Sequence, residues 1–409
     1  MKAASIILFI FLALSADLKV TLFPYVHWIL WSILILPFML RDFLKEKLII
    51  SPMFGIAFIL VMLGMISSYY YGSGIENLIQ TIKLFLILIT LYYFIYYSKI
   101  GWNEINIALN TAVIVNVMLL IFGLLGVSSM ASLMTSDGRW GTALAFPGSL
   151  VKIGAFGFYF NIMAFLLLPK KQKVIHFFML LLSLFVIYMD GSRTGMLLIF
   201  LTLFFVFLFY IIVNHKNKIK SVVLPFFAFI IFFAGLIIAI PFLLQSRIGK
   251  SLVNLLNSGS FSTGLELVDP ARFMMYKSAI EKIYNNPFIG TGAFTTVGIY
   301  EDGTSMVVHN TYLQLWGDFG LFGLLGMCLI FFGWIAFLPK IMLKLQVNIN
   351  KKENIVVSSS ILMLIYYIGN GLFHPYSTEL SEWITFILPL TYCYSYYRGY
   401  FQRRGEKLI

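Results

Sequence analysis

The chain has 409 residues, of which 60% are hydrophobic and 11% are charged, and its mean hydropathy is +0.91. This composition excludes a soluble globular protein, because apolar runs long enough to cross ~30 Å of hydrocarbon recur along the sequence. The formal net charge of +12 does not indicate nucleic-acid binding, since basic residues cluster in short loops that alternate with nearly uncharged ones. Cys328 and Cys393 both lie in apolar segments, which argues against a disulfide framework or a cysteine metal site.

Hydropathy predicts an all-α polytopic membrane protein with about twelve transmembrane helices. The first apolar run lacks a convincing cleavage site, so we interpret it as a retained helix rather than a signal peptide. The predicted spans, in chain order, are 3–15, 22–40, 49–68, 77–97, 105–127, 146–168, 174–190, 195–213, 221–245, 319–338, 355–373 and 383–397. They divide the chain into an N-terminal bundle of about nine spans (1–245), a large loop (246–318) and a C-terminal part with a basic tail (319–409).

The distribution of lysine and arginine predicts how these spans are oriented. About 19 basic residues fall on one side of the membrane and about 8 on the other, although the second side has the longest loop. Basic loops remain in the cytoplasm of bacterial membrane proteins. We therefore expect both termini to be cytoplasmic and the loop 246–318 to face outward.

The outward loop contains a predicted amphipathic helix. Asp269 and Pro270 suit a helix cap and the first helical position. Apolar residues then follow at helical spacing, namely Phe273, Tyr276, Ile280, Ile283 and Tyr284. We expect this helix to lie on the membrane surface or over a cavity.

Three arginines on the predicted outward side are candidate ligands for an anion. Arg193 lies in a tight Gly-Ser-Arg-Thr-Gly turn, Arg272 begins the loop helix, and Arg139 is a weaker candidate of the same kind. The planar guanidinium suits bidentate contacts with phosphate oxygens. The alternative is that Arg193 and Arg139 extend to ordinary lipid headgroups, and that Arg272 pairs with Asp269.

His309 is a candidate general base, because an imidazole titrates near neutral pH and can take a proton from a sugar hydroxyl. A lone histidine is more often structural, so this prediction depends on its neighbours. Asn310 can orient the ring, and Tyr312 is a polar residue at the membrane edge. Carboxylates that flank the histidine are alternative orienting groups or bases, namely Glu301, Asp302 and Asp318.

Further polar residues occur on the predicted outward side and within the spans. His374, Glu379 and Glu382 fall in the last outward segment and can complete the rim of a site. Lys83 and Lys152 lie within predicted spans, where a charge must face the bundle interior or reach an interface. The sequence shows no Walker-type phosphate loop and no metal-ligand cluster, so we expect no cofactor and no metal.

One motif resembles a known family. His309-Asn310, nine residues, Gly320, two residues and Gly323 resemble the His-(Asn/Ser/Gln)-x9-Gly-x-x-Gly motif of bacterial O-antigen ligases. The same region is similar to the C-terminal domain that these ligases share with Wzy-type polysaccharide polymerases. The resemblance covers the fifth to tenth predicted spans. It implies a GT-C-like fold and a metal-independent, inverting glycosyltransferase.

The resemblance also implies substrates and residue roles. Arg193 and Arg272 stand where the family carries two key arginines, and Arg139 resembles a further one; they would hold the diphosphate of an undecaprenyl-diphosphate-linked glycan donor. His309, with Asn310 or a loop carboxylate orienting its ring, would activate the acceptor hydroxyl. Tyr312 is the remaining substrate-binding candidate.

Three functions remain open. A polymerase would join repeat units into O-antigen or capsular or exopolysaccharide, and is slightly favoured because such proteins are frequent. An O-antigen ligase would transfer the finished glycan to lipid A-core. A transporter or flippase for lipid-linked glycans is less favoured, because it should show internal repeats, which we do not find. The expected setting is the bacterial inner membrane, with the lipid bilayer and a chain-length regulator as further partners and no nucleic acid.

Overall fold

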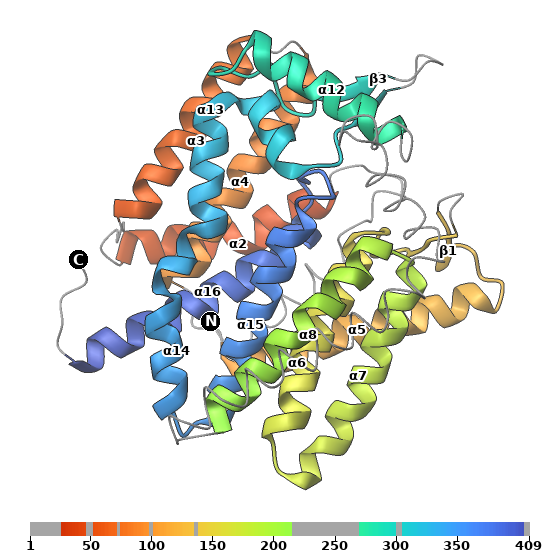
Figure 1. The fold of residues 1–409 in the computed structure, drawn as a ribbon, viewed down its shortest axis with the longest axis vertical. Coiled ribbons are helices and arrows are strands. Elements are labelled where there is room, and N and C mark those ends of the chain that lie inside the picture. The colour runs from red at the N-terminus through yellow and green to blue at the C-terminus, as the bar shows by residue number, and fades with distance from the viewer. Residues whose placement is uncertain are drawn as a thin grey trace, which may run out of the picture.

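The computed structural model describes residues 26–45, 52–71, 74–97, 101–134, 138–214, 270–299 and 305–404. These segments form a bundle of long helices with two short hairpins (Figure 1). The first helices are α2 (Val26–Lys45), α3 (Pro52–Tyr71), α4 (Ile75–Tyr97), α5 (Trp102–Leu124), α6 (Ser149–Leu167), α7 (Lys170–Asp190) and α8 (Arg193–Asn214). The later helices are α12 (Pro270–Asn285), α13 (Thr311–Phe332), the 3-10 helix η2 (Gly333–Phe337), α14 (Leu338–Val347), α15 (Lys351–Asn370) and α16 (Leu380–Arg404).

The structure confirms an all-α polytopic membrane protein. Within the described segments, seven helical stretches are long and apolar enough to cross a membrane. The predicted spans 3–15 and 221–245 lie outside the described residues, so the predicted total of about twelve stays a prediction. Two antiparallel hairpins add short strands that hydropathy did not predict: β1 (Ala131–Leu133) with β2 (Trp140–Thr142), and β3 (Val297–Ile299) with β4 (Ser305–Val307).

Helix α13 begins before the span predicted at 319–338. Asn310 caps its first turn, because the Asn310 side-chain oxygen accepts hydrogen bonds of 3.0 Å from the backbone N–H groups of Tyr312 and Leu313. The helix is interrupted at Gly320, which has φ 65° and ψ −173°. The polar turn after Asn310 is thus separated from the apolar helix that follows Gly320.

The glycine spacing of the motif has a structural explanation in α13. A Cβ atom at Gly320 would lie 2.2 Å from the backbone oxygen of Phe288, and its positive φ favours glycine. Gly323 faces α3, where a Cβ on Gly64 would lie 2.7 Å from the Gly323 Cα. The first glycine therefore permits the interruption, and the second allows α3 and α13 to pack closely.

Helix α12 starts at Pro270 as predicted, but its buried side coincides only in part with the predicted apolar face: Ile283 is 7% exposed and Tyr276 packs on the buried cluster. Met275 and Ala279 are 2% and 0% exposed and pack with Val308, whereas Ile280 and Tyr284 are 57% and 85% exposed. The buried face is selected by the adjacent hairpin, because β3 lacks a side chain at Gly298, where Met275 approaches. The exposed apolar residues remain available for contact with lipid.

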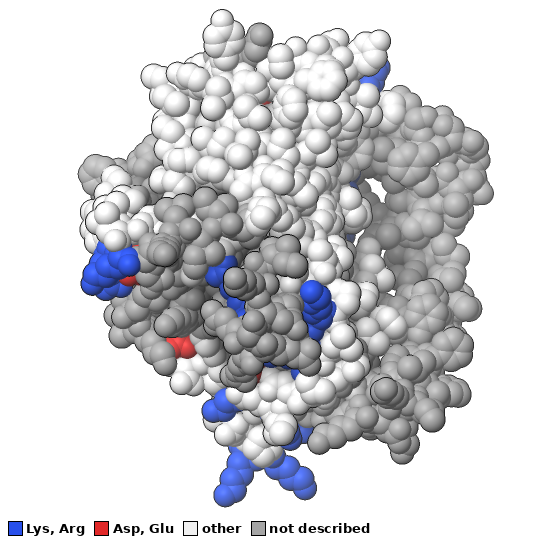
Figure 2. All heavy atoms as spheres, turned by 90° about the vertical axis from the view of Figure 1, so that its left-hand side faces the viewer, with Lys and Arg blue, Asp and Glu red and all other residues white. Residues whose placement is uncertain are grey.

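The two ends of the bundle differ in charge and structure. The α6–α7 and α14–α15 turns, whose helices begin with Lys170-Lys171 and Lys351-Lys352, lie at the lower end of the ribbon view (Figure 1). Lysine and arginine gather over the lower part of the face in Figure 2, while its upper part is largely uncharged. Helix α12 and β3 lie at the opposite end (Figure 1).

Candidate functional site

A polar pocket of about 380 Å³ lies where α4, α6 and α16 meet the segment before α13 and the connection between α15 and α16. Most of its lining residues carry polar or charged side chains. They are Gln80, Arg139, Pro147, Gly148, Lys152, Phe294, His309, His374, Pro375, Tyr376, Ser377, Thr378, Glu379 and Glu382. The pocket therefore brings together polar side chains that lie about three hundred positions apart in the sequence, from Gln80 to Glu382.

Arg139 is held in this pocket by a buried carboxylate. Its Nη2 donates to Asp190 Oδ1 at 2.8 Å and its Nε donates to the Asp190 carbonyl at 3.1 Å. Asp190 Oδ2 accepts from the backbone N–H groups of Gly148 and Val151 at 2.6 and 2.9 Å, at the start of α6. A carboxylate suits the positive end of a helix. Asp190 thus ties Arg139, the end of α7 and the start of α6 together.

Two lysines of membrane helices are paired with the segment that begins α16. Lys83 Nζ lies 3.4 Å from Glu379 Oε1, and Lys152 Nζ forms an ion pair with Glu382. The two lysine side chains are only 6% and 5% exposed. A buried charge in a membrane helix is costly without a partner, and here both face the bundle interior. The two pairs join α4 and α6 to the same wall of the pocket.

His309 and His374 lie close together in the pocket. Their ring centroids are 6.4 Å apart, with an angle of 42° between the planes. Burial, together with smaller electrostatic contributions from Lys152, Arg139, His309 and Arg272, lowers the pKa of His374 to about 3. His374 is therefore neutral near pH 7. Arg139 lines the pocket, whereas Arg272 lies in the first turn of α12 and is not among the lining residues.

Asp318 has a framework role in this structure. Its side chain is fully buried, and its carboxylate accepts from the Thr296 N–H and hydroxyl at 2.9 and 2.6 Å. It also accepts from the Phe294 N–H at 2.7 Å and from the Tyr376 hydroxyl at 2.9 Å. Phe294 lines the pocket with a positive φ of 58°, a strained conformation that these contacts hold. Asp318 therefore organises the pocket wall and does not line the cavity.

The structure does not bring all predicted site residues together. Arg193 is exposed at the start of α8 and does not line the pocket. The Tyr312 hydroxyl donates to the Ile368 carbonyl at 3.0 Å and its ring stacks on Phe332, so it packs α13 against α15. Asn310 caps α13 and donates to the Leu372 carbonyl at 3.2 Å, so these contacts do not support a role in orienting the imidazole.

The structure adds residues to the candidate site that the sequence motif does not contain. Glu301 and Asp302 lie outside the described residues. His374 lines the pocket, as expected of a residue at the rim of the site, and Lys83 and Lys152 are buried beside it; a charge inside an apolar helix is the signal that points to the two lysines. Within the described segments, no group of three or more His, Cys, Asp or Glu side chains could hold a metal ion.

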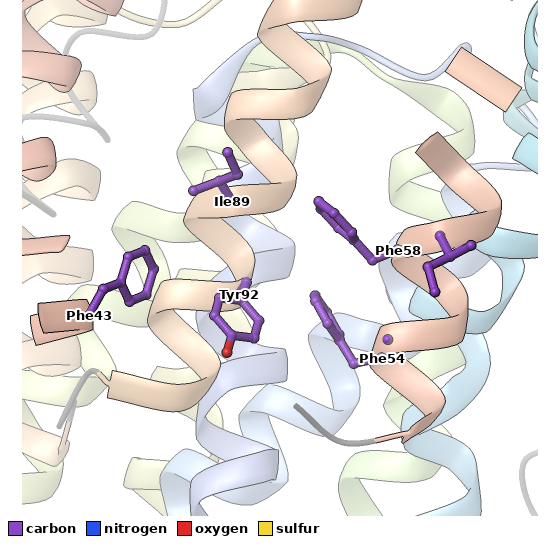
Figure 3. A pocket seen from close by; sticks show the side chains of 7 residues that line it. Phe43, Phe54, Phe58, Ile89 and Tyr92 are labelled. Atoms are coloured by element: carbon purple, nitrogen blue, oxygen red, sulfur yellow. The ribbon is translucent and has the colours of Figure 1, made fainter. Parts of the chain in front are cut away.

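A second pocket, of about 400 Å³, lies between α2, α3 and α4 (Figure 3). Its labelled lining residues are Phe43, Phe54, Phe58, Ile89 and Tyr92. It lacks charged lining residues and so offers a hydrocarbon environment rather than groups for acid–base chemistry.

The fold and the polar pocket define a multi-pass membrane protein with a candidate catalytic site at the end of its bundle. Residues 178–328 match a family model described as O-antigen ligase. The matched segment contains Arg193, Arg272 and His309. No curated protein matches the chain. The resemblance to the O-antigen ligase and Wzy-type family is confirmed over this segment, and it indicates a glycan-transferring enzyme of glycan assembly.

Proposed function

We propose that this chain is a membrane glycosyltransferase that polymerises undecaprenyl-diphosphate-linked repeat units into O-antigen or capsular or exopolysaccharide. The observation that carries the proposal is the polar pocket, in which His309 and His374 line one cavity together with Arg139 and Lys152. The family match over residues 178–328 supports the reaction class. The proposed location is the outer face of the bacterial inner membrane, with both termini cytoplasmic, which agrees with lysine-rich turns at the opposite end of the bundle.

The proposed chemistry is an inverting displacement without a metal. An acceptor hydroxyl attacks the anomeric carbon of the donor sugar while the bond from that carbon to the diphosphate oxygen breaks. His309 accepts the hydroxyl proton. Arg139 and Arg272 stabilise the negative charge that develops on the leaving diphosphate. Arg139 is suited to this role because Asp190 fixes its guanidinium in advance.

Arg193 lies outside the pocket, so its proposed role differs from that of Arg139. It lies within the matched segment and begins a helix whose N-terminus favours an anion, but its side chain is exposed and outside the pocket lining. We propose that Arg193 contacts the donor before or at the pocket entrance. Tyr312 and Asn310 support the position of α13.

An O-antigen ligase is the second candidate, because the matching family model carries that description. Its donor would be the finished lipid-linked glycan and its acceptor would be lipid A-core. Polymerase and ligase share the chemistry of a sugar hydroxyl attacking a lipid-diphosphate donor. The pocket therefore supports both, and the acceptor must be identified by experiment.

Deletion of the gene separates these functions. The host glycan is resolved on a gel after deletion and after complementation with the wild type, His309→Ala or the exposed-surface control Lys277→Gln. A single repeat unit left on its anchor indicates a polymerase, whereas full-length glycan left on undecaprenyl diphosphate indicates a ligase. We expect the control to restore the glycan and His309→Ala to fail despite normal membrane levels. Repeat units trapped on the cytoplasmic face would contradict both and indicate a flippase.

A further inference from the structure

The connection between α15 and α16 contributes a second imidazole to the polar pocket. His374 and His309 both line the cavity, with ring centroids 6.4 Å apart. The family match ends at residue 328 and therefore does not include His374. The roles proposed for His309 and the arginines leave this side chain without a function.

The backbone of His374 is fixed to the helix that follows His309. The Thr311 N–H donates to the Gly371 carbonyl at 2.7 Å, and the Thr311 hydroxyl donates to the His374 carbonyl at 2.8 Å. Because Thr311 is the first residue of α13, the start of that helix and the turn containing His374 form one unit. The distance between the two imidazoles is therefore set by the framework.

The other side of the same connection is also anchored on α13. The Tyr376 N–H donates to Gln314 Oε1 at 2.9 Å, and the Tyr376 hydroxyl donates to Asp318 Oδ2 at 2.9 Å. Tyr376, Gln314 and Asp318 are all buried. Contacts on both sides of His374 thus hold its position, as expected of a residue that positions a substrate.

Burial and the neighbouring charges keep the His374 ring neutral near pH 7. Burial is the main cause of its low pKa, and Lys152 on α6, Arg139 before β2, His309 before α13 and Arg272 on α12 all lower the pKa further. On the remaining wall, Glu379 and Glu382 line the pocket and form ion pairs with lysines. A neutral imidazole has one N–H donor and one nitrogen acceptor, which matches a sugar hydroxyl that both donates and accepts.

We propose that His374 binds a hydroxyl group of the acceptor sugar next to the hydroxyl that His309 deprotonates. This inference rests on the proposed glycosyltransferase function. Both rings line the same cavity with centroids 6.4 Å apart, so two neighbouring hydroxyls of one sugar in that cavity can each lie about 2.8 Å from one imidazole nitrogen. His374 holds the acceptor without gaining or losing a proton, and His309 accepts the proton of the attacking hydroxyl.

The test uses three variants of the full-length protein purified in detergent. His374→Phe keeps a ring of similar size but removes the hydrogen bonds, His374→Asn keeps one donor and one acceptor, and His309→Ala removes the proposed base. The probes are the lipid-linked glycan and lipid A-core extracted from a host that lacks the gene. The measurements are kcat/KM, its dependence on pH between 5 and 9, and the temperature of unfolding.

We expect His374→Phe to lower kcat/KM about tenfold or more, because a hydrogen-bonding partner of the substrate is lost. His374→Asn should recover most of this loss, with the same pH midpoint as the wild type and an unchanged unfolding temperature in both variants. Equal activity of His374→Phe and the wild type would overturn the proposal. It would also be overturned if both variants lost activity together with stability, or if His374→Asn moved the pH midpoint.

The His309→Ala variant separates this inference from the proposed function. Loss of transfer in His309→Ala, with normal activity in His374→Phe, overturns only the role of His374. Transfer that persists in His309→Ala overturns the base assignment on which both rest. Absence of any transfer by the wild type with these probes overturns the proposed function and the inference with it.

Discussion

Individual charged side chains of the pocket are held in place by buried partners. Asp190 is the clearest case, since it is 0% exposed and binds both Arg139 and the first backbone N–H groups of α6. A guanidinium held in this way needs little rearrangement when a diphosphate binds. Arg139 is therefore a stronger candidate for binding the diphosphate than its sequence context alone indicates.

Replacing this arginine tests whether its fork-like geometry matters. We expect Arg139→Lys to reduce glycan transfer by about tenfold or more, because lysine keeps the charge but cannot contact Asp190 and the substrate through several N–H groups. Transfer is measured with the lipid-linked glycan, and Arg41→Lys on exposed α2 surface is the matched control. Equal activity of the two variants would remove Arg139 from the binding site.

The lowered pKa of His374 predicts how stability changes with pH. The unfolded chain binds a proton near pH 6.5 whereas the folded chain does so only near pH 3, so stability falls as pH decreases from about 6.5 towards 3. The largest loss expected from this group at pH 5, relative to pH 7 and above, is about 2 kcal/mol. Denaturant unfolding at pH 5 and 7 should show a smaller difference for His374→Asn than for the wild type. An identical difference would show that His374 is not the group responsible.

Helix α13 combines site positioning and helix packing in the one motif that begins at His309. Its first turn is capped by Asn310 and positions His309, and its membrane part packs against α3 through Gly323. The interruption at Gly320 separates the two parts. The spacing that made the motif recognisable is therefore set partly by helix packing and not by chemistry alone.

Filling the contact between α3 and α13 should destabilise the protein. In Gly64→Leu, the added Cβ would already meet the Gly323 Cα at 2.7 Å, so the helices must separate. We expect a loss of about 1–3 kcal/mol in unfolding free energy, typical of an overfilled core. Phe322→Leu is the control, because Phe322 is 41% exposed on α13, next to Gly323. A Gly64→Leu variant as stable as the control would contradict the close packing.

Across the whole bundle, the pocket forms where helices that are distant in sequence meet at the start of α16. Lys83 on α4 and Lys152 on α6 both pair with this segment, through Glu379 and Glu382. Neither pair would be stable if the helices were separated in the bilayer, because each charge would then lack a partner. The arrangement of the bundle and the polarity of the site thus depend on each other.

A double-mutant cycle measures this dependence. Glu379→Gln should destabilise the protein by about 1–3 kcal/mol, because its ion pair with the buried Lys83 is replaced by a weaker neutral contact. Lys83→Met combined with Glu379→Gln should recover a large part of that loss, and the coupling is obtained from denaturant unfolding in detergent. Additive effects of the two substitutions would show that the pair contributes no coupling energy.

The family match and the structure also define how far the resemblance extends. The match contains the histidine, the two arginines and the glycines of the motif, but it excludes Arg139, Lys152 and His374, which complete the pocket. Those three come from other helices and connections. The site is therefore larger than the segment by which the family is recognised.

The membrane class and most helix positions in the described segments follow from the amino-acid sequence alone, and the candidate base His309 lines the polar pocket. Hydrocarbon length and the positions of glycine and proline act locally, so they can be read along the chain. Which polar residues share a cavity depends on tertiary packing. In the folded protein, Met275 and Ala279 of α12 are buried, Asn310 caps α13, and His374 lies beside His309. These outcomes depend on packing between segments far apart in sequence, for which periodicity along a single helix carries no information.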